Sequence, residues 1–291
     1  MPRRRAIACP DSLKGVLPAR EAAAALAAGF AEAGIECLQL PLGDGGEGTA
    51  EALAGRVGEA AVVEAAQYVP FEPAARDVTA VSTRPLGEAI ARVRAPRLLV
   101  GLGGTANMDA GAGLLDVLDA LPAPTTVLCD VETSLYDAPR TFGPQKGATP
   151  EQVLELEARF RADARLVPYA HLPGSGAAGG LGAALASLGA ELVPGAASVL
   201  DLLGFDPVPF DLVVTGEGRV DATTGRGKVP GEVARRCAAA GVRCAVFGGV
   251  VEAPLDRRPD VYALSGDPAR AAADLEGLGR RLGLRLLDTP G

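Results

Sequence analysis

The sequence predicts an α/β protein of two domains, in which a Rossmann-like parallel-sheet domain is built from both termini and a second α/β domain is inserted between them. Strand-like apolar runs alternate with helix-like segments near both ends, the middle is less regular, and 291 residues are many for one hydrophobic core. We therefore expect a terminal domain of residues 1–66 and 196–291 and an inserted domain of residues 67–195, with a ligand cleft between them.

The first 66 residues have the pattern of a βαβαβ unit. Strands are expected at residues 5–9, 36–42 and 60–66, and helices at residues 18–34 and 45–57. Pro18 suits the first turn of a helix and Gly34 suits a C-cap. Because parallel strands need crossover connections, this alternation predicts a parallel sheet with right-handed crossovers.

The middle of the chain is less regular because prolines interrupt residues 67–95. Strands are expected there at residues 97–102 and 126–131, and helices at residues 108–120, 149–164 and 174–188. Thr149, with Gln152 three positions later, is a typical helix N-cap. The alternation returns near the C-terminus, with strands expected at residues 211–215, 242–247 and 260–264 and helices at residues 229–240 and 267–281.

Composition and charge exclude several classes of function. A net charge of −8 disfavours nucleic acid or an anionic membrane as a broad partner. No apolar run is long enough to span a bilayer, and no long apolar segment follows the basic start at residues 1–5, so we expect a cytoplasmic protein without a signal peptide. Five scattered cysteines, a single histidine and no tryptophan disfavour a disulfide framework, a zinc site and a histidine-dependent triad. Carboxylates, lysines and backbone amides are left to carry any chemistry.

The lysines are few, and each has a glycine next to it. Lys14, Lys146 and Lys228 are the three lysines among 28 basic residues. A lysine offers a compact charge on a flexible stem, so lysines in glycine-rich loops suggest ammonium groups that bind phosphate oxygens. The alternative is that three exposed lysines have simply escaped replacement by arginine.

Five loops share one pattern, in which glycine and an acidic or hydroxyl residue follow a strand and precede a helix. They are residues 10–15, 43–49, 103–109, 173–180 and 216–221. Ligands bind at the carboxyl ends of strands in open α/β sheets, where glycines allow backbone amides to approach an anion. The loops therefore predict a phosphate-handling cleft, although plain strand–helix turns remain an alternative.

Two of these loops match the GxGxxG pattern of dinucleotide-binding proteins, which would suggest an oxidoreductase. Asp44 and Glu47 inside the first loop disfavour that interpretation, because they would repel a pyrophosphate. Acid-rich glycine loops are better suited to Mg²⁺, which takes one or two carboxylates together with phosphate oxygens. We expect two or three metal ligands among Asp44, Glu47, Asp109, Asp130 and Glu217.

Several motifs occur in one order along nearly the whole chain, and together they resemble the bacterial glycerate kinase family. They are Asp-Ser-Leu-Lys-Gly at residues 11–15, Asp-Gly-Gly-Glu-Gly-Thr at 44–49, Gly-Gly-Thr-Ala at 103–106, Cys-Asp-Val at 129–131 with Phe-Gly-Pro-Gln-Lys-Gly-Ala at 142–148, the glycine tract 174–182 and Gly-Glu-Gly-Arg-Val-Asp at 216–221. The resemblance implies a two-domain, Mg²⁺-dependent enzyme that phosphorylates a hydroxyl of D-glycerate with ATP by direct phosphoryl transfer.

Carried onto this sequence, the resemblance gives each loop an expected role. Catalytic roles are expected for Asp11, Lys14 and Asp221. Substrate or phosphate binding is expected for Ser12, Gly45, Gly46, Thr49, Gly103, Gly104, Thr105, Lys146, Gly176, Gly216, Arg219 and Lys228. The carboxylate of Asp11 or Asp221 would orient or deprotonate the acceptor hydroxyl, and Arg219 would pair with a carboxylate or phosphate.

The sequence departs from the family pattern within the inserted domain. Residues 105–111 and 132–135 differ from the usual family segments, and the chain is short near residues 69–77 and 120–127. A non-catalytic homologue, or one that binds a different ligand, is therefore the alternative function. The expected partners are D-glycerate and ATP, with a homodimer left open. Phosphorylation at the 2- or the 3-hydroxyl is also left open.

Overall fold

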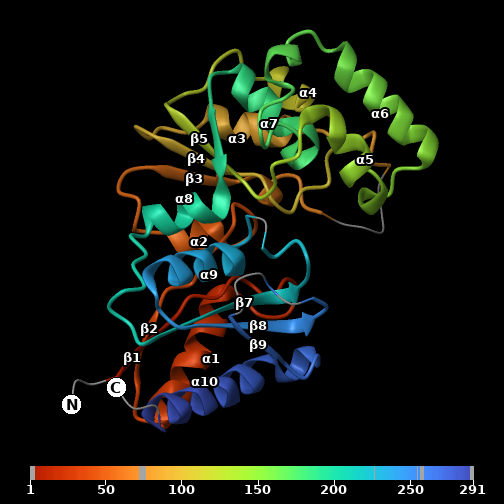
Figure 1. Ribbon diagram of the computed structural model, residues 1–291. Coiled ribbons are helices and arrows are strands. Elements are labelled where there is room, and N and C mark those ends of the chain that lie inside the picture. The colour runs from red at the N-terminus through yellow and green to blue at the C-terminus, as the bar shows by residue number, and fades with distance from the viewer. Residues whose placement is uncertain (1–3, 72–76, 226, 254, 256–258, 289–291) are drawn as a thin grey trace. The chain divides into compact units, whose positions relative to one another are not determined.

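The computed structural model describes residues 4–71, 77–225, 227–253, 255 and 259–288 (Figure 1). The chain divides into two compact units, of which unit 1 comprises Met1–Gly43 and Val199–Gly291 and unit 2 comprises Asp44–Ser198. Each unit contains one parallel sheet flanked by helices, which confirms the predicted α/β class. No helix among the described residues is long and apolar enough to cross a membrane.

The sheet of unit 1 has five parallel strands in the order β2-β1-β7-β8-β9. These strands are β1 (Arg5–Ala8), β2 (Glu36–Gln39), β7 (Leu212–Val220), β8 (Cys244–Val251) and β9 (Asp260–Ala263). The strands from the two ends of the chain meet where β1 pairs with β7, and Ile7 lies opposite Val213. The helices of this unit are α1 (Ala19–Glu32), α9 (Val229–Ala240), the 3₁₀ turn Pro268–Arg270 and α10 (Ala271–Asp288), while α8 (Gly195–Leu202) crosses the unit boundary.

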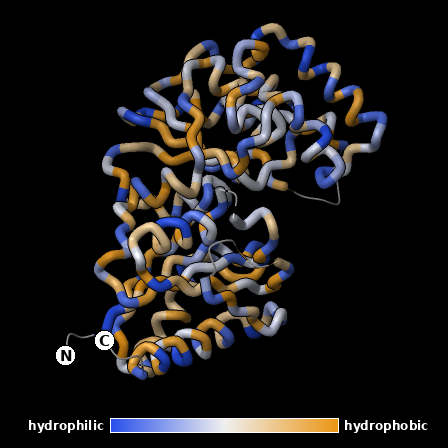
Figure 2. Tube along the Cα trace, viewed as in Figure 1, coloured by the Kyte–Doolittle hydropathy of each residue, from blue (hydrophilic) through white to orange (hydrophobic). Residues whose placement is uncertain are grey.

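Helices α1 and α10 pack closely, with glycines at their contact. A Cβ atom on Gly29 would overlap the carbonyl oxygen of Glu276, and one on Gly279 would overlap that of Leu26. Figure 2 shows hydrophobic and hydrophilic residues alternating along α10, as expected for a helix with one buried face. The apolar face joins Leu26, Phe30 and Phe247 in the core of unit 1.

The sheet of unit 2 has four parallel strands in the order β3-β4-β5-β6. Its strands are β3 (Ala61–Glu64), β4 (Leu98–Gly101), β5 (Thr125–Cys129) and β6 (Glu191–Pro194). Its helices are α2 (Thr49–Leu53), α3 (Arg84–Ala91), α4 (Ala112–Leu115), α5 (Ala138–Phe142), α6 (Pro150–Ala162) and α7 (Ala177–Ser187), with 3₁₀ turns at Ala65–Gln67, Leu135–Asp137, Pro144–Lys146 and Val167–Tyr169.

The first predicted domain boundary is wrong. Residues 44–66 were assigned to the terminal domain, but β3 pairs with β4, and the division falls after Gly43. The βαβαβ pattern predicted the elements, but buried parallel strands are similar apolar runs, so the sequence of a strand does not indicate which of two sheets it joins. The second boundary lies after Ser198, close to the expected position at residue 195.

Several element bounds also differ from the expectation, and the differences affect the glycine-rich loops. Strand β7 continues to Val220 through the segment predicted as a loop, because residues 216–220 remain paired with β8. Helices α2 and α4 begin later than predicted, since Gly48 (φ +89°) and Gly111 (φ +73°) adopt left-handed conformations just before them. The predicted N-cap of α6 is confirmed, because Thr149 and Gln152 form a capping box.

Candidate functional site

The predicted site residues fall in both units, and several of them lie at the carboxyl ends of strands. In unit 1, the loop after β1 lies beside the end of β7. The amide of Asp11 donates a hydrogen bond to the carbonyl oxygen of Gly216 at 2.9 Å. A Cβ atom on Gly218 would lie 3.5 Å from both the Cα of Leu13 and the amide nitrogen of Lys14. The structure thus brings the 11–15 and 216–221 segments together.

Asp11 and Ser12 are held at the start of this loop. Asp11 is 4% exposed, and its Oδ1 accepts a hydrogen bond from the Ser12 amide at 2.7 Å. Lys14 is exposed two positions later. A nearly buried carboxylate and an exposed ammonium therefore share one short loop in unit 1.

Glu217 and Lys228 form an ion pair beyond the middle of β7. Lys228 Nζ lies 3.5 Å from Glu217 Oε2, and the two side chains are 28% and 12% exposed. Thr224 donates its hydroxyl proton to Glu217 Oε1 at 2.8 Å. Lys228 is also the N-cap residue of α9, so the ion pair lies at a helix N-terminus, where anions are favoured.

Asp221 stabilises the turn between β7 and α9. Its Oδ1 accepts hydrogen bonds from the Thr223 amide at 2.7 Å and the Thr223 hydroxyl at 2.6 Å. The Thr223 hydroxyl lowers the pKa of Asp221, and the nearby Lys228 ammonium acts in the same direction. A carboxylate with a lowered pKa remains ionised near neutral pH but accepts a proton weakly. This environment suits Asp221 to binding a cation better than to general-base catalysis.

Arg219 extends to the surface of unit 1. Its guanidinium donates to Glu252 Oε1 at 2.9 Å, and its side chain is 62% exposed. An exposed ion pair of this kind is weak, so Arg219 can exchange Glu252 for another carboxylate or a phosphate at little cost.

In unit 2, the loop at residues 44–46 crosses the carboxyl ends of β4 and β5. The amide of Gly103 donates to the carbonyl oxygen of Gly45 at 3.1 Å, and the Gly46 amide donates to Asp44 Oδ1 at 2.9 Å. A Cβ atom on Gly103 would lie 2.6 Å from the Cα of Gly46 and 3.1 Å from Asp130 Oδ2. We call Asp44, Gly45, Gly46, Gly103 and Asp130 the glycine cradle.

The other predicted residues near the cradle differ in exposure. Thr49 is fully buried and accepts the Gly45 amide on its hydroxyl at 3.1 Å, so it shapes the loop. Glu47 and Gly104 are exposed. Gly176 is buried, and its amide donates to the Thr133 carbonyl oxygen at 2.9 Å, which ties the glycine tract to the segment after β5.

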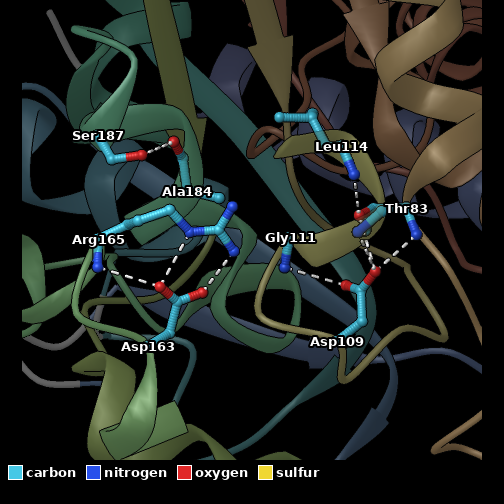
Figure 3. A network of polar contacts seen from close by, with 9 residues as sticks. Thr83, Asp109, Gly111, Leu114, Asp163, Arg165, Ala184 and Ser187 are labelled. Carbon is cyan, nitrogen blue, oxygen red and sulfur yellow. Dashed lines mark hydrogen bonds and ion pairs between the residues drawn. The ribbon is translucent and has the colours of Figure 1, made fainter. Parts of the chain in front are cut away.

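Asp109 is the centre of a buried hydrogen-bond network (Figure 3). Its Oδ2 accepts the amide and the hydroxyl of Thr83, both at 2.8 Å, and the Gly113 amide at 3.2 Å. Its Oδ1 accepts the Gly111 amide at 3.0 Å and the Asn107 side-chain amide at 3.3 Å. These five donors occupy the acceptor positions of one carboxylate. The predicted metal-ligand role of Asp109 therefore does not fit, and Asp109 instead fixes the 103–113 segment.

Lys146 is a half-buried cation that is influenced by the charges of two carboxylates. Within the described residues its ammonium donates one hydrogen bond, to the backbone oxygen of Asn107 at 3.0 Å. Burial lowers the pKa of Lys146 to about 8, although the charges of Asp130 and Asp109 oppose that shift. An ammonium has three donors, so this half-buried group has capacity left for an anionic ligand.

Two buried oxygens in the same segment have no hydrogen-bond partner among the described residues. They are Thr105 Oγ1 and Asn107 Oδ1. The orientation of the Asn107 amide is determined by its nitrogen, which donates to the Ala178 carbonyl oxygen at 2.6 Å as well as to Asp109. A buried oxygen that receives no hydrogen bond lowers the free energy of unfolding by about 1–3 kcal/mol. Such unsatisfied groups are often retained where a segment has a functional role.

A cavity of about 570 Å³ lies in unit 2 close to this segment. Its walls are Tyr68, Val69, Pro70, Asp77, Ala80, Val81, Ser82, Arg84 and Pro85. Pro70 forms an isolated β-bridge with Thr105, so the cavity adjoins the loop that follows β4. Its volume is within the range of about 300–1,000 Å³ that is typical of small-molecule sites.

Within the described part of the chain, no three histidine, cysteine or acidic side chains are grouped closely enough to hold a metal ion by themselves. Mg²⁺ is commonly bound by one or two carboxylates together with the phosphates of its ligand. The glycine cradle fits such an arrangement, because Asp130 Oδ2 borders a position where only a glycine can stand. In unit 2 the structure offers Asp44 and Asp130 for this purpose. Glu217 is a separate candidate in unit 1.

Sequence reasoning missed three residues that shape the site: Thr83, Asn107 and Thr224. Thr83 is the N-cap residue of α3 and is followed by Arg-Pro, a sequence typical of a helix start that would have located α3. Asn107 and Thr224 lie inside recognised or neighbouring loops, but their roles depend on contacts with residues distant in the sequence. No local signal distinguishes such residues.

Comparisons with known proteins agree on one family. The model of the glycerate kinase family matches residues 6–67, 55–123 and 121–264. The chain is 32% identical to glycerate 2-kinase of Escherichia coli over 304 residues, which covers 77% of this chain and 79% of that protein. It is also 32% identical to glycerate kinase of Bacillus subtilis over 309 residues, covering 79% of this chain and 80% of the relative.

A solved structure from Salmonella typhimurium LT2, described as glycerate kinase 2, has the same fold. It superimposes with a TM-score of 0.79 at 29% identity, and the alignment covers 98% of this chain and 99% of that one. The family model spans most of the chain, and the relatives and the solved structure are similar along most of their lengths. The chain therefore belongs to the glycerate kinase family.

Proposed function

We propose that this enzyme transfers the γ-phosphoryl group of Mg²⁺-bound ATP directly to a hydroxyl group of D-glycerate. Family membership supports the glycerate kinase activity. The observation that carries the proposal is the glycine cradle of unit 2, where Gly45, Gly46 and Gly103 bring backbone and the Asp130 carboxylate close together. The amides of these glycines donate to Gly45, Asp44 and Thr49, so the cradle contributes carboxylates rather than backbone donors. Phosphoryl transfer depends mainly on positioned cations, which such carboxylates can hold.

The three lysines would neutralise phosphate charge in this reaction. Lys146 is half-buried, its ammonium donates one hydrogen bond among the described residues, and the charges of Asp130 and Asp109 act on it. Lys228 lies at the N-terminus of α9, and Lys14 lies in the loop after β1. Mg²⁺, when bound, would offset the phosphate charge, with Asp44 and Asp130 as its candidate ligands in unit 2 and Glu217 as a separate candidate in unit 1.

We assign proton transfer to Asp11 and phosphate or metal orientation to Asp221. The Thr223 hydroxyl lowers the pKa of Asp221 and makes it a weak proton acceptor. Asp11 is nearly buried and fixed by the Ser12 amide, which suits a group that must meet a substrate hydroxyl in one orientation. Arg219 would bind the carboxylate of the hydroxy acid by releasing Glu252.

The experiment is a coupled assay of ADP release with ATP, Mg²⁺ and D-glycerate. D-lactate and 3-hydroxypropionate, which lack the 3-hydroxyl and the 2-hydroxyl of D-glycerate respectively, serve as matched acceptors that also report which hydroxyl is phosphorylated. We expect ADP release with D-glycerate that is lost on chelation of Mg²⁺. D-glycerate that binds in calorimetry without ADP release would contradict the proposal and support the non-catalytic alternative.

A further inference from the structure

Thr224 contacts three segments of unit 1: the end of β7, the turn that follows it, and the first turn of α9. It is fully buried, its hydroxyl oxygen accepts the Asp221 amide at 3.0 Å, and its hydroxyl proton is donated to Glu217 Oε1 at 2.8 Å. A Cβ atom on Gly231, in the first turn of α9, would overlap the Thr224 carbonyl oxygen. The backbone of Thr224 is therefore confined between a turn and a helix, and its hydroxyl direction is fixed.

The distance between Glu217 and Lys228 is long for a fully formed ion pair. Their closest nitrogen and oxygen atoms are 3.5 Å apart, whereas charge-assisted N–H···O bonds are usually ~2.7–2.9 Å long. Glu217 is 12% exposed and receives a short hydrogen bond from Thr224 on its other oxygen. This hydrogen bond restrains the carboxylate from rotating fully onto the ammonium.

We propose that Thr224 is a positioning residue that holds Glu217 back from Lys228, so that the Lys228 ammonium stays available to a phosphate-bearing ligand. The inference rests on the proposed function only in taking that ligand to be the Mg²⁺-bound nucleotide. Without the hydroxyl, Glu217 closes on Lys228 and neutralises the charge that the phosphate needs. Thr224 itself touches neither substrate, so it acts through Glu217.

The test measures the affinity of each variant for Mg²⁺·ADP by calorimetry. Thr224→Val preserves shape and removes the hydroxyl, and we expect its Kd to rise by at least ~10-fold. Thr224→Ser restores the hydroxyl and returns the Kd to within about twofold of the unmodified chain. A Thr224→Val variant that binds as tightly as the unmodified chain, or a Thr224→Ser variant that binds as weakly as Thr224→Val, overturns the proposal.

Two further variants separate positioning from a general loss of stability. Thr215 is a matched control, because it is a buried threonine on the strand that carries Glu217, and its hydroxyl donates to the Cys9 carbonyl oxygen at 2.8 Å. Thr215→Val should lower the thermal midpoint without changing the Kd, and an equal rise in Kd contradicts the proposal. Glu217→Gln weakens the attraction to Lys228. In that background Thr224→Val should therefore leave the Kd of the single Glu217→Gln variant unchanged. Additive effects of the two substitutions on the Kd refute the coupling.

These outcomes also separate the inference from the proposed function. A chain that binds Mg²⁺·ADP but does not phosphorylate D-glycerate contradicts the proposed function, and the Kd series still decides the role of Thr224. If Thr224→Val does not fold, Thr224→Cys is measured in its place, because a thiol is a weaker donor of similar shape. A chain with no affinity for Mg²⁺·ADP overturns the inference.

Discussion

Replacing Lys146 with methionine should stabilise the protein while abolishing its activity. Methionine fills a similar volume but carries no charge, and Lys146 is a half-buried lysine with a lowered pKa. A residue that lowers the free energy of unfolding is commonly retained because the function requires it. The variant therefore tests whether the position of this ammonium was selected for ligand binding.

The size of the gain follows from the pKa of Lys146, which falls from 10.5 to about 8 on folding because burial disfavours the charged form. Below pH 8 both the folded and the unfolded chains carry the proton, and the folded state bears a cost of about 3 kcal/mol. Between pH 8 and 10.5 the unfolded chain binds more protons, so the stability of the unmodified protein rises with pH. Losing the hydrogen bond to Asn107 costs about 1 kcal/mol, which leaves a net gain of about 2 kcal/mol at pH 7.

The assay is urea denaturation at pH 7 and at pH 9.5, with Lys14→Met as the matched control. Lys14 is exposed, so its replacement should leave the free energy of unfolding nearly unchanged. We expect the gain of Lys146→Met to shrink at the higher pH and ADP release to be lost. A Lys146→Met variant that is less stable than the unmodified chain at pH 7, or one that remains active, would refute the reasoning.

Three further predictions follow from the candidate site. Asp221→Asn should lower turnover by at least ~10²-fold in the ADP-release assay with little change in thermal midpoint, because the amide has no charge with which to orient the metal or phosphate, and near-normal turnover would remove Asp221 from the mechanism. Lys14→Arg and Lys228→Arg should each lower kcat/KM by at least ~10-fold, because a wide guanidinium does not replace a compact ammonium in a glycine-rich loop, and full activity in both would refute this. Asp109→Asn should lower the free energy of unfolding by at least about 2 kcal/mol in urea denaturation, because an amide group would face the Thr83 donors, and an unchanged midpoint would contradict the structural role.

The regular parts of the fold could be predicted because buried parallel strands are apolar runs bounded by glycine or proline. The strands β1, β4 and β5 lie within one or two residues of their expected positions. Strand β7 was predicted too short, since Gly216 and Gly218 indicate a loop locally, while their pairing with β8 keeps the backbone extended. Tertiary pairing thus overrode a local signal.

The candidate site could be located from the sequence, but the role of each residue could not. Glycine-rich segments at strand ends identified the 11–15, 44–49, 103–109 and 216–221 segments. The acidic residues that follow the strands look alike in the sequence, yet Asp109 accepts hydrogen bonds from five donors while Asp130 borders the glycine cradle. That difference depends on Thr83, which lies 26 residues from Asp109 in the chain. The roles of carboxylates are set by such distant donors, which local patterns do not contain.

The most direct test of the proposed reaction follows phosphorus atoms rather than ADP. The enzyme is mixed with ATP, Mg²⁺ and D-glycerate, and the ³¹P NMR spectrum is recorded over time beside a parallel sample of the Lys146→Met variant. The proposed reaction predicts that the γ-phosphate signal of ATP is replaced by a phosphomonoester signal coupled to a glycerate proton, in the unmodified enzyme alone. Release of inorganic phosphate in place of that phosphomonoester, or no change in the ATP signals, would contradict it.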